Sequence, residues 1–285
     1  MRNAMNARIL TCVVVCVVTL GGCRSQHVSR EPVAPKRTTP TTPAAPPAAW
    51  QEIGRSRQGN PLQAASIGGG PYRVYIIGGI HGNEPEGLAA AMRLVDLAPS
   101  EVRGVALRVL RDANPDGTAA NTRGNSRGLD LNRNWPASNF NRSPSRGATP
   151  LSEPETQAVH RDIDAFRPHL LIVFHSIANG PFVNFDGPAG EHAEVFVAAA
   201  RVKDSRWKVV PRMGYPTPGS LGSYYGVDRR IPILTIEFRR GQDEASAVAA
   251  VMVGLRALID RGLREAVGFR SAELQQEEKN VPGFQ

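Results

Sequence analysis

Residues 72–84 have the sequence Tyr-Arg-Val-Tyr-Ile-Ile-Gly-Gly-Ile-His-Gly-Asn-Glu, and this stretch decides the fold class. Its first part is rich in β-branched and aromatic residues and lies between Pro71 and two glycines, which predicts a strand over 72–78. The segment 85–97 that follows is rich in Ala and Leu with helical spacing. A strand that leads directly into a helix is typical of α/β domains with parallel strands.

Similar signals recur along the rest of the chain. Residues 51–54 and 62–66, separated by a polar segment, predict a hairpin. The pattern predicts further strands at 105–110, 170–174 and 233–238, a helix that starts at a Ser152–Glu155 capping box and runs to about residue 166, a helix over 244–267, and a long irregular region over 113–150. We therefore expect a single α/β domain over 50–270, with a mixed, mostly parallel twisted sheet flanked by helices, and a flexible tail over 271–285.

The N-terminal segment predicts export and a lipid anchor. Two arginines precede an apolar run over 9–20, and its 12 residues are too few to span a membrane but suit a signal peptide. Leu20-Gly-Gly-Cys23 then resembles the lipobox of bacterial lipoproteins, which implies a signal peptide over 1–22 and lipid on the sulfur of Cys23. The alternative is ordinary secretory cleavage that leaves a free cysteine. We expect a chain anchored to a bacterial membrane and facing the periplasm or wall.

The segment between Cys23 and the domain is a predicted tether. Residues 24–49 carry six prolines among Thr, Ala and basic residues, a composition that favours a semi-extended chain over a packed core. Residues 1–49 hold six basic residues against one acid, so five of the eight net positive charges precede the domain. The basic balance therefore argues little for a nucleic-acid surface. We expect no nucleic-acid partner and infer no obligate protein partner.

The cysteines exclude several kinds of site. All three, Cys12, Cys16 and Cys23, lie in or beside the leader, so the domain after them has no thiol. A disulfide framework, a zinc–thiolate site and a cysteine nucleophile are thereby excluded from the domain. A metal bound there must be held by histidines and carboxylates.

Histidines and carboxylates do follow the predicted strands. His81 and Glu84 come after the strand at 72–78, His175 ends the next buried strand, and Glu237 ends the strand near the C-terminus. Because ligands gather at the carboxyl ends of strands in α/β folds, these side chains are expected to meet. Two imidazoles and one carboxylate form a three-ligand zinc site with a position open for water, and a spare Glu can take the proton of that water. The alternative is that His175 is a core histidine and Glu237 an ion-pair partner.

Six sequence blocks, taken in order, resemble the zinc carboxypeptidase family. They are His81-Gly-Asn-Glu84, Asn114-Pro-Asp-Gly117, Gly128-Leu-Asp-Leu-Asn-Arg-Asn-Trp135, Glu153-Pro-Glu-Thr156, Phe174-His-Ser176 and Thr235-Ile-Glu-Phe238. The likeness covers roughly residues 50–265. With Thr122-Arg-Gly-Asn125 included, the chain is most similar to the bacterial murein peptide amidases, which cut the γ-D-glutamyl–diaminopimelate bond of cell-wall peptides.

The resemblance implies roles for the residues that match the metal motifs. His81, Glu84 and His175 match the ligands of one zinc ion per chain, and Glu237 matches the general base. We expect the Asn114-Pro-Asp-Gly117 turn to be structural, with Asp116 as an alternative candidate to orient a ligand imidazole. No ligand or base position departs from the family pattern.

The resemblance also implies substrate-binding residues. Asn132 and Arg133 match the pair that grips the terminal carboxylate of the substrate, which suits the two-pronged geometry of a guanidinium. Arg123 matches the arginine that stabilises the oxyanion, with Arg127 as its competitor. Tyr215 lies where the family carries a mobile tyrosine over the substrate, although the alignment there is loose.

These roles predict zinc-dependent hydrolysis of an amide bond next to a free carboxylate end. We favour a muropeptide amidase that cuts γ-D-glutamyl–meso-diaminopimelate, because an exported, lipid-anchored domain faces peptidoglycan. A general peptide metallocarboxypeptidase is the main alternative. An N-acyl amino acid deacylase and a non-catalytic wall-binding lipoprotein are further alternatives. The pocket for the terminal residue separates the first two, and the apolar Leu221 expected there does not by itself favour diaminopimelate.

Overall fold

The computed structural model describes residues 49–97, 99–102 and 104–279. The predicted signal peptide, Cys23 and all but the last residue of the predicted tether lie outside the described residues. At the other end, the last helix, α5 (Glu244–Lys279), includes part of the predicted tail, and residues 280–285 are again outside the described part. Within the described part, none of the helices combines the length and the apolar character needed to cross a bilayer.

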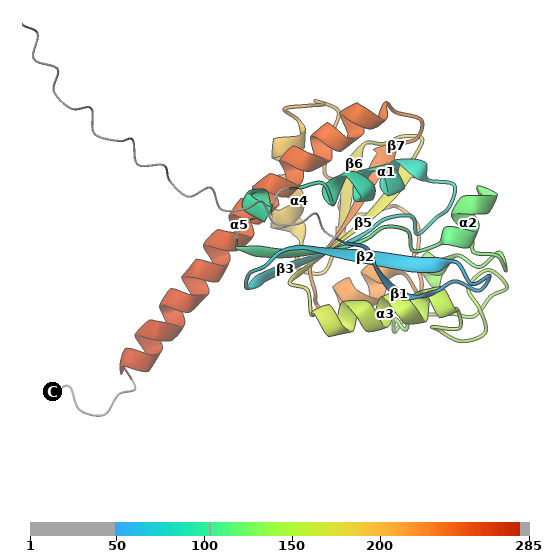
Figure 1. Ribbon diagram of the computed structural model, residues 1–285, viewed down its shortest axis with the longest axis horizontal. Coiled ribbons are helices and arrows are strands. Elements are labelled where there is room, and N and C mark those ends of the chain that lie inside the picture. The colour runs from blue at the N-terminus through green and yellow to red at the C-terminus, as the bar shows by residue number, and fades with distance from the viewer. Residues whose placement is uncertain (1–48, 98, 103, 280–285) are drawn as a thin grey trace, which may run out of the picture. The chain divides into compact units, whose positions relative to one another are not determined.

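A seven-stranded mixed sheet runs through the domain (Figure 1). Its strands are β1 (Gln51–Arg55), β2 (Pro61–Gly68), β3 (Tyr72–Ile77), β4 (Val105–Leu110), β5 (Leu170–Ile177), β6 (Phe182–Asp186) and β7 (Ile233–Arg239). They are ordered β1-β2-β4-β3-β5-β7-β6, and the four central strands β4, β3, β5 and β7 are mutually parallel. Antiparallel pairs complete both edges. The predicted α/β class, the hairpin and every predicted strand are confirmed.

Helices cover both faces of the sheet (Figure 1). They are α1 (Pro85–Leu94), α2 (Pro115–Ala120), α3 (Pro154–Phe166), α4 (Gly190–Ala200) and α5, with short 3₁₀ turns η1 (Pro99–Val102) and η2 (Leu131–Arg133) and a π-helical segment η3 (Gly222–Asp228). Helices α1, α4 and α5 pack on one face, and α3 and η3 on the other. The region 113–150 was predicted to be irregular, but it contains α2 and η2.

The starts of α2 and α3 correct two expectations. Asn114 caps α2 by accepting a hydrogen bond from the backbone N–H of Gly117 at 3.0 Å, a signal that the sequence did contain. The capping box at Ser152 is wrong, because α3 is capped by Glu153 without a side-chain hydrogen bond to the helix. Instead the Ser152 hydroxyl donates to the Glu153 carboxylate at 3.0 Å, and that carboxylate is engaged by groups from other loops.

Alternation along β5 decides which face receives the functional side chains. Leu170 and Phe174 pack into the core beneath α1, α4 and α5, whereas Leu171 and Val173 pack into the core beneath α3. Successive side chains of a strand point to opposite faces. His175 therefore leaves the end of β5 on the α3 and η3 side of the sheet.

The strand order creates a natural binding position between β3 and β5. The chain passes from β3 to β4 on one side and later returns to β5 on the other side of β3. Ligand sites in open α/β sheets form at such a reversal, outside the carboxyl ends of the strands. The segments that follow β3 and end β5 carry His81, Glu84 and His175.

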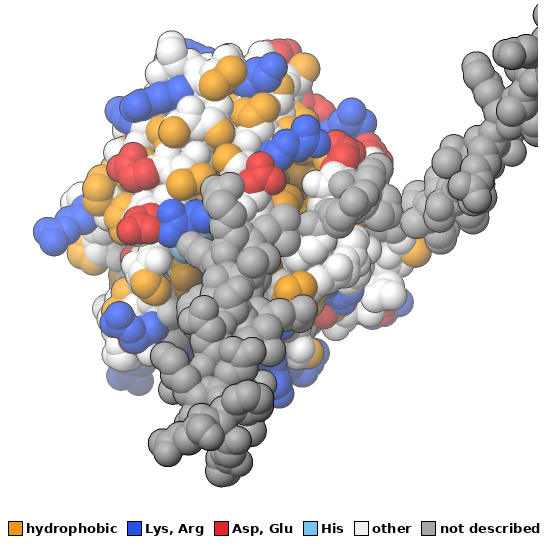
Figure 2. Space-filling view, turned by 90° about the vertical axis from the view of Figure 1, so that its left-hand side faces the viewer, with side chains coloured by type: hydrophobic (Ala, Val, Ile, Leu, Met, Phe, Trp, Pro, Cys, Tyr) orange, Lys and Arg blue, Asp and Glu red, His pale blue; other side chains and the backbone are white. Residues whose placement is uncertain are grey.

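The surface carries charges of both signs. On the face drawn in Figure 2, basic and acidic side chains are interspersed among apolar ones. Ion pairs such as Arg93–Asp96 and Arg256–Glu101 join opposite charges at 2.8 and 2.7 Å. On this face the pattern is typical of a solvated surface.

Candidate metal centre and active site

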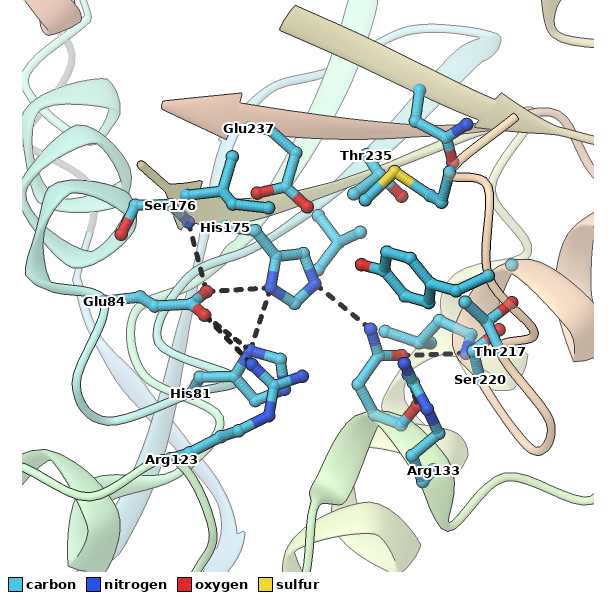
Figure 3. Close-up of a pocket in the computed structure, with 18 of the residues that line it drawn as sticks. His81, Glu84, Arg123, Arg133, His175, Ser176, Thr217, Ser220, Thr235 and Glu237 are labelled. Atoms are coloured by element: carbon cyan, nitrogen blue, oxygen red, sulfur yellow. Dashed lines mark hydrogen bonds and ion pairs between the residues drawn. The ribbon is translucent and has the colours of Figure 1, made fainter. Parts of the chain in front are cut away.

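Three buried side chains converge where β3 and β5 end (Figure 3). His175 Nδ1 lies 3.0 Å from His81 Nδ1 and 2.9 Å from Glu84 Oε2, and His81 Nδ1 lies 3.1 Å from Glu84 Oε1. One ligand atom from each side chain lies within 4.8 Å of the other two. The structure thus brings together the three residues that the sequence predicts as metal ligands.

The loop between β3 and α1 fixes two of them. At Gly82 a Cβ atom would lie 1.9 Å from the backbone carbonyl carbon of Gly117, so only glycine allows this approach between the loop and α2. Glu84 is the N-cap residue of α1, and its carboxylate accepts a hydrogen bond from the backbone N–H of Ser176 at 3.1 Å. Backbone packing on one side and β5 on the other therefore hold His81 and Glu84 in place.

Asp130 orients the His81 imidazole. Its Oδ1 lies 2.9 Å from His81 Nε2, and its Oδ2 accepts a hydrogen bond from Arg123 Nε at 3.0 Å. With Nε2 donating to the carboxylate, Nδ1 of His81 keeps a lone pair that faces the cluster. Asp116, the candidate for this role, is the wrong residue. It accepts hydrogen bonds from groups of the β1–β2 turn, including Asn60 Nδ2 at 2.8 Å.

Both carboxylates of this assembly are ionised. Burial alone would raise the pKa of Glu84, but His175 and His81 lower that pKa well below its ordinary value. Burial also opposes ionisation of Asp130, and the adjacent His81 and Arg123 lower its pKa in the same way. Anionic Glu84 is the form that a metal ion binds.

Glu237 faces the cluster from the neighbouring strand (Figure 3). Its Cα is the register partner of His175 across β5 and β7, and only 6% of the residue is exposed. Burial raises the pKa of Glu237, and the nearby His175 partly opposes this shift. A buried carboxyl whose pKa is moved toward neutrality is suited to accept and return a proton.

The two candidate arginines lie in different places. Arg123 Nη1 lies 3.3 Å from Glu84 Oε1, so its guanidinium is at the metal cluster. Arg127 Nη1 instead lies 3.2 Å from Glu153 Oε1. The geometry therefore favours Arg123 over Arg127 as the group that can reach a developing oxyanion.

The three predicted substrate-binding residues line the same pocket as the metal cluster. Asn132 Nδ2 lies 3.1 Å from His175 Nε2, and its Oδ1 accepts a hydrogen bond from the backbone N–H of Leu221 at 3.0 Å. Arg133 donates to the backbone carbonyl of Asn132 at 2.7 Å, and burial lowers the pKa of its guanidinium. Tyr215 is 52% exposed, and burial of the rest of its side chain raises its pKa.

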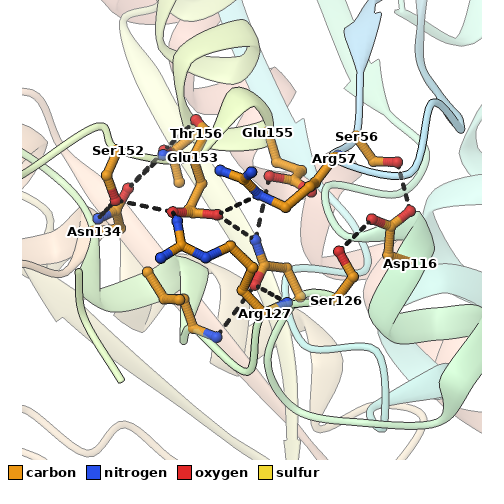
Figure 4. A network of polar contacts seen from close by, with 12 residues as sticks. Ser56, Arg57, Asp116, Ser126, Arg127, Asn134, Ser152, Glu153, Glu155 and Thr156 are labelled. Carbon is orange, nitrogen blue, oxygen red and sulfur yellow. Dashed lines mark hydrogen bonds and ion pairs between the residues drawn. The ribbon is translucent and has the colours of Figure 1, made fainter. Parts of the chain in front are cut away.

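A buried polar network fixes the loop that carries Asn132 and Arg133 (Figure 4). Asn125 Nδ2 donates to Glu153 Oε2 at 2.8 Å, while its Oδ1 accepts the backbone N–H groups of Arg127 and Leu129. The amide of Asn134 bonds to Ser152 and to two backbone carbonyls of the following loop. Because the network includes residues on both sides of η2, it holds the segment between Arg123 and Arg133 in one conformation.

Sequence reasoning missed three residues that line the pocket or contact the cluster. Asp130 lies inside the block Gly128–Trp135, but the spacing within that block does not indicate that its side chain contacts His81. Arg240 donates to the backbone carbonyl of Ser176 at 3.0 Å and lies 3.6 Å from Glu84 Oε1, yet it belongs to no motif. Asp186 lines the pocket from the end of β6 and also lies outside every motif.

Comparison with known proteins identifies the family. Residues 46–188 match the family model described as zinc carboxypeptidase, which is half of the chain. The chain belongs to the zinc carboxypeptidase family. Its sequence is 33% identical to murein peptide amidase A of Escherichia coli K12 over 225 residues, which covers 70% of this chain and 86% of that protein. It is 29% identical to the protein of the same name from Vibrio campbellii, over 58% and 68% of the two chains.

Solved structures of the family have the same fold. The murein-tripeptide amidase of E. coli O157 superposes with a TM-score of 0.63 at 28% identity, over 76% of this chain and 93% of that one. Bovine thrombin-activatable fibrinolysis inhibitor superposes with a TM-score of 0.66 at 17% identity, over 76% and 91%, a likeness of fold alone.

The residues of the cluster fit the zinc that this family uses. Two imidazole nitrogens, His81 Nδ1 and His175 Nδ1, face each other at 3.0 Å with a carboxylate beside them. His81 Nε2 already donates its hydrogen to Asp130, so His81 Nδ1 carries a lone pair. That lone pair must face a cation or a shared proton. Two nitrogens and one carboxylate are the donor set of a catalytic zinc. Zinc is therefore the cofactor, and this member of the family is a hydrolytic enzyme.

Proposed function

We propose that this enzyme hydrolyses an amide bond one residue from a free carboxylate, and that the bond is γ-D-glutamyl–meso-diaminopimelate in peptidoglycan stem peptides. One observation carries the proposal: the pocket that contains the metal cluster and Glu237 is also lined by Arg133 and Arg240, two cations that can each hold a carboxylate. The name of the relatives, murein peptide amidase, supports the same substrate class.

Residues of this chain supply the proton transfers and the charge stabilisation. His81, Glu84 and His175 would hold the zinc, which would supply polarisation of the substrate carbonyl and a water with a pKa lowered to about 7. Glu237, which is buried and has a raised pKa, accepts a proton from the water and returns it to the leaving amine. Arg123, held beside Glu84 by its bond to Asp130, opposes the negative charge that develops on the carbonyl oxygen.

One side of the pocket suits the free carboxylate. A guanidinium binds a carboxylate through two parallel hydrogen bonds, and Arg133 with Asn132 provides such a group. The Asn132 amide lies 3.1 Å from the imidazole of His175. A carboxylate held there belongs to the residue next to the scissile bond, so cleavage releases a single terminal residue.

The other side of the pocket suits an acidic group in the acyl half of the substrate. Arg240 donates to the carbonyl of Ser176, and Ser176 lies on the opposite side of His175 from Arg133 (Figure 3). A γ-linked glutamyl residue carries its free α-carboxylate on this acyl side, whereas an ordinary peptide has an amide there. Arg240 would bind that carboxylate, which favours the muropeptide over a generic peptide.

Cleavage assays with paired substrates test the proposal. The zinc-loaded enzyme is offered L-Ala-γ-D-Glu-diaminopimelate and an ordinary peptide that ends in leucine, and products are identified by mass spectrometry. We expect cleavage of the γ-glutamyl bond at a kcat/KM at least tenfold higher than that of the leucine peptide. Cleavage of the leucine peptide alone would make the chain a general carboxypeptidase, and cleavage only of an N-acyl amino acid would make it a deacylase.

The proposed location brings the enzyme to that substrate. A signal peptide ending before Cys23, lipid on Cys23 and a proline-rich tether would hold the domain near peptidoglycan at a bacterial membrane. In cells, we expect the full chain in the membrane fraction and a Cys23→Ser variant outside it. A variant that remains in the membrane fraction would contradict the anchor and leave the hydrolytic function unaffected.

A further inference from the structure

A second pocket lies at the opposite end of the sheet from the metal cluster. Its volume is about 160 Å³, and it lies between the end of α3 and the residues at or before the starts of β3, β5 and β7. The polar residues that line it include Arg73, Arg167, His169 and Arg229. From His169 the chain advances six residues to reach His175 at the metal cluster, which is about 20 Å at ~3.3 Å per residue of strand. This amino-end pocket is therefore separate from the active site.

Positive charge is in excess in the amino-end pocket. Arg229 forms an ion pair with Asp164, which is the only acidic residue among the described residues that line this pocket. Arg73 and Arg167 line the same pocket, and neither has an ion-pair partner in the described part of the chain. Two guanidinium charges are therefore left without a neighbouring carboxylate, and a concave surface of this kind attracts an anion.

The backbone holds these two arginines at the pocket. Arg73 Nε donates to the backbone carbonyl of Arg167 at 2.7 Å, and the Nη2 amino group of Arg73 has no hydrogen-bond partner among the described residues. Arg167 directly follows α3 with a left-handed backbone, φ 54°, at a position where glycine is the usual residue. Its guanidinium makes no hydrogen bond to another described residue. A side chain that is placed at a cost in backbone energy, and that has no contact of its own, points to a ligand.

His169 adds a neutral hydrogen-bond donor. Its Nδ1 accepts a hydrogen bond from the backbone N–H of Arg73 at 3.0 Å, so the imidazole carries its hydrogen on Nε2. Partial burial and the charge of Arg73 lower the pKa of His169, which keeps the ring neutral. The ring stacks on Tyr72 with the two centroids 5.5 Å apart. Nε2 has no partner in the described part of the chain, so its N–H group is available to an oxyanion.

We propose that the amino-end pocket binds a phosphate group through Arg73, Arg167 and the Nε2–H group of His169. A guanidinium donates two parallel hydrogen bonds to a phosphate, and the remaining phosphate oxygens can accept from further donors at the same time. A carboxylate has only two oxygens and is already satisfied by one arginine, so it would engage fewer of these groups. The inference concerns a site at the other end of the domain and does not depend on the proposed substrate.

The position of the amino-end pocket determines what a bound phosphate would do. The central strands are parallel, so this pocket lies at their amino ends and the metal cluster at their carboxyl ends. Phosphate groups occur both on lipid headgroups and on soluble molecules, and the same donors suit either source. If the phosphate belongs to a lipid headgroup, the domain binds a membrane surface with its active site directed away from the bilayer. A soluble phosphate compound would occupy the pocket without orienting the domain.

Titration of the zinc-loaded full chain with inorganic phosphate, followed by NMR of the histidine rings, tests the inference. We expect a saturable shift of the His169 signal in the millimolar range or tighter, and a much smaller shift with acetate. Arg167→Gly removes one guanidinium and suits the left-handed backbone, so phosphate affinity should fall by about tenfold or more while the unfolding temperature is not lowered. The matched control Arg93→Gln, at an exposed surface pair, should keep the wild-type phosphate affinity.

Two results would overturn the inference. Shifts confined to His81 and His175 would place phosphate at the metal cluster instead. An unchanged phosphate affinity in Arg167→Gly, with a lowered unfolding temperature, would show that Arg167 only stabilises the end of α3.

Vesicles of phosphatidylglycerol identify the source of the phosphate. The full chain is used with Cys23→Ser, so that no lipid on the chain contributes to binding. A fall of about fivefold in vesicle association when Arg167→Gly is added indicates a lipid headgroup. Unchanged vesicle association, together with weakened binding of inorganic phosphate, indicates a soluble phosphate compound and still supports the site.

Discussion

Asp130 Oδ1 and His81 Nε2 are 2.9 Å apart, and this contact turns the other nitrogen of His81 toward the metal cluster. Partners of this kind fix both the tautomer and the direction of a ligand imidazole. The zinc affinity of the enzyme should therefore depend on a residue that does not touch the metal.

We predict that Asp130→Asn weakens zinc binding by about 10–100-fold, measured by competition with a fluorescent chelator. The matched control is Asp116→Asn, which alters hydrogen bonds to the β1–β2 turn and should lower thermal stability while leaving zinc affinity near the wild-type value. Equal zinc affinities of Asp130→Asn and the wild type would remove Asp130 from this role.

Removal of zinc should affect both activity and stability. His81, Glu84 and His175 are buried, and burying polar side chains without a partner costs free energy. Bound zinc offsets that cost and therefore stabilises the folded state. A chelator is expected to abolish hydrolysis and to lower the unfolding temperature, and added zinc should restore both. In His175→Ala the unfolding temperature should respond little to zinc, and a full response would argue for a different ligand set.

Replacing the general base should separate catalysis from metal binding. Glu237→Gln keeps the size of the side chain but cannot accept the water proton, so kcat should fall by about 10²–10⁴-fold. Zinc content measured by mass spectrometry should remain at one per chain. Glu52→Gln, at an exposed pair with Arg55, serves as the control and should have wild-type kcat. Undiminished turnover in Glu237→Gln would discard the assignment.

The two arginines of the Arg123–Arg127 segment should give different phenotypes. Arg123→Met removes a positive charge beside Glu84 and should reduce kcat by about 10²–10³-fold. Arg127→Met loses its pair with the buried Glu153 and should lower the unfolding temperature with little change in kcat. The opposite result, with kcat lost only in the Arg127 variant, would reverse the two roles.

Asp112 should make folding stability depend on pH. Burial raises the pKa of this carboxyl from its ordinary 3.8 to about 6 in the folded protein. The folded state therefore binds the proton more tightly than the unfolded state, and stability should decrease as the pH rises from about 4 to about 6, by roughly 2–3 kcal/mol in total. Above this window the loss is complete.

Asp112→Asn removes the titration. The difference in free energy of unfolding between wild type and variant, measured in urea from pH 3.5 to 7.5, isolates this group because other carboxyls cancel. We expect the wild type to lose stability relative to the variant across that window. A difference that stays constant with pH would show that burial does not raise the pKa of the Asp112 carboxyl.

Local patterns were sufficient for the strands and for the metal ligands. The strand at 72–78 and the buried run at 170–174 are marked by β-branched composition, which depends only on near neighbours in sequence. His81, Glu84 and His175 follow those strands directly, and parallel strands bring their carboxyl ends to one edge. The same reasoning placed Glu237, because it lies near the carboxyl end of β7, a strand that pairs with β5.

Local patterns failed where loops are positioned by distant contacts. The partner of the His81 imidazole, for which only Asp116 was named, and the open choice between Arg123 and Arg127 both concern the region 113–150. There the direction of each side chain is set by Glu153, Asn125 and the β1–β2 turn, which lie far away in sequence. Short-range spacing contains no information about which carboxylate such a loop presents.

The sequence alone thus determined the order of the strands along the chain, the residue types of the metal cluster and the candidate for the base, since each of these residues follows or belongs to a strand that is marked by its near neighbours in sequence. Only the tertiary structure decided that Asp130 orients His81 and that Asp186 occupies the pocket opposite Gly222. Those relationships arise from register between strands and from packing between loops, and neither is written in the spacing of neighbouring residues.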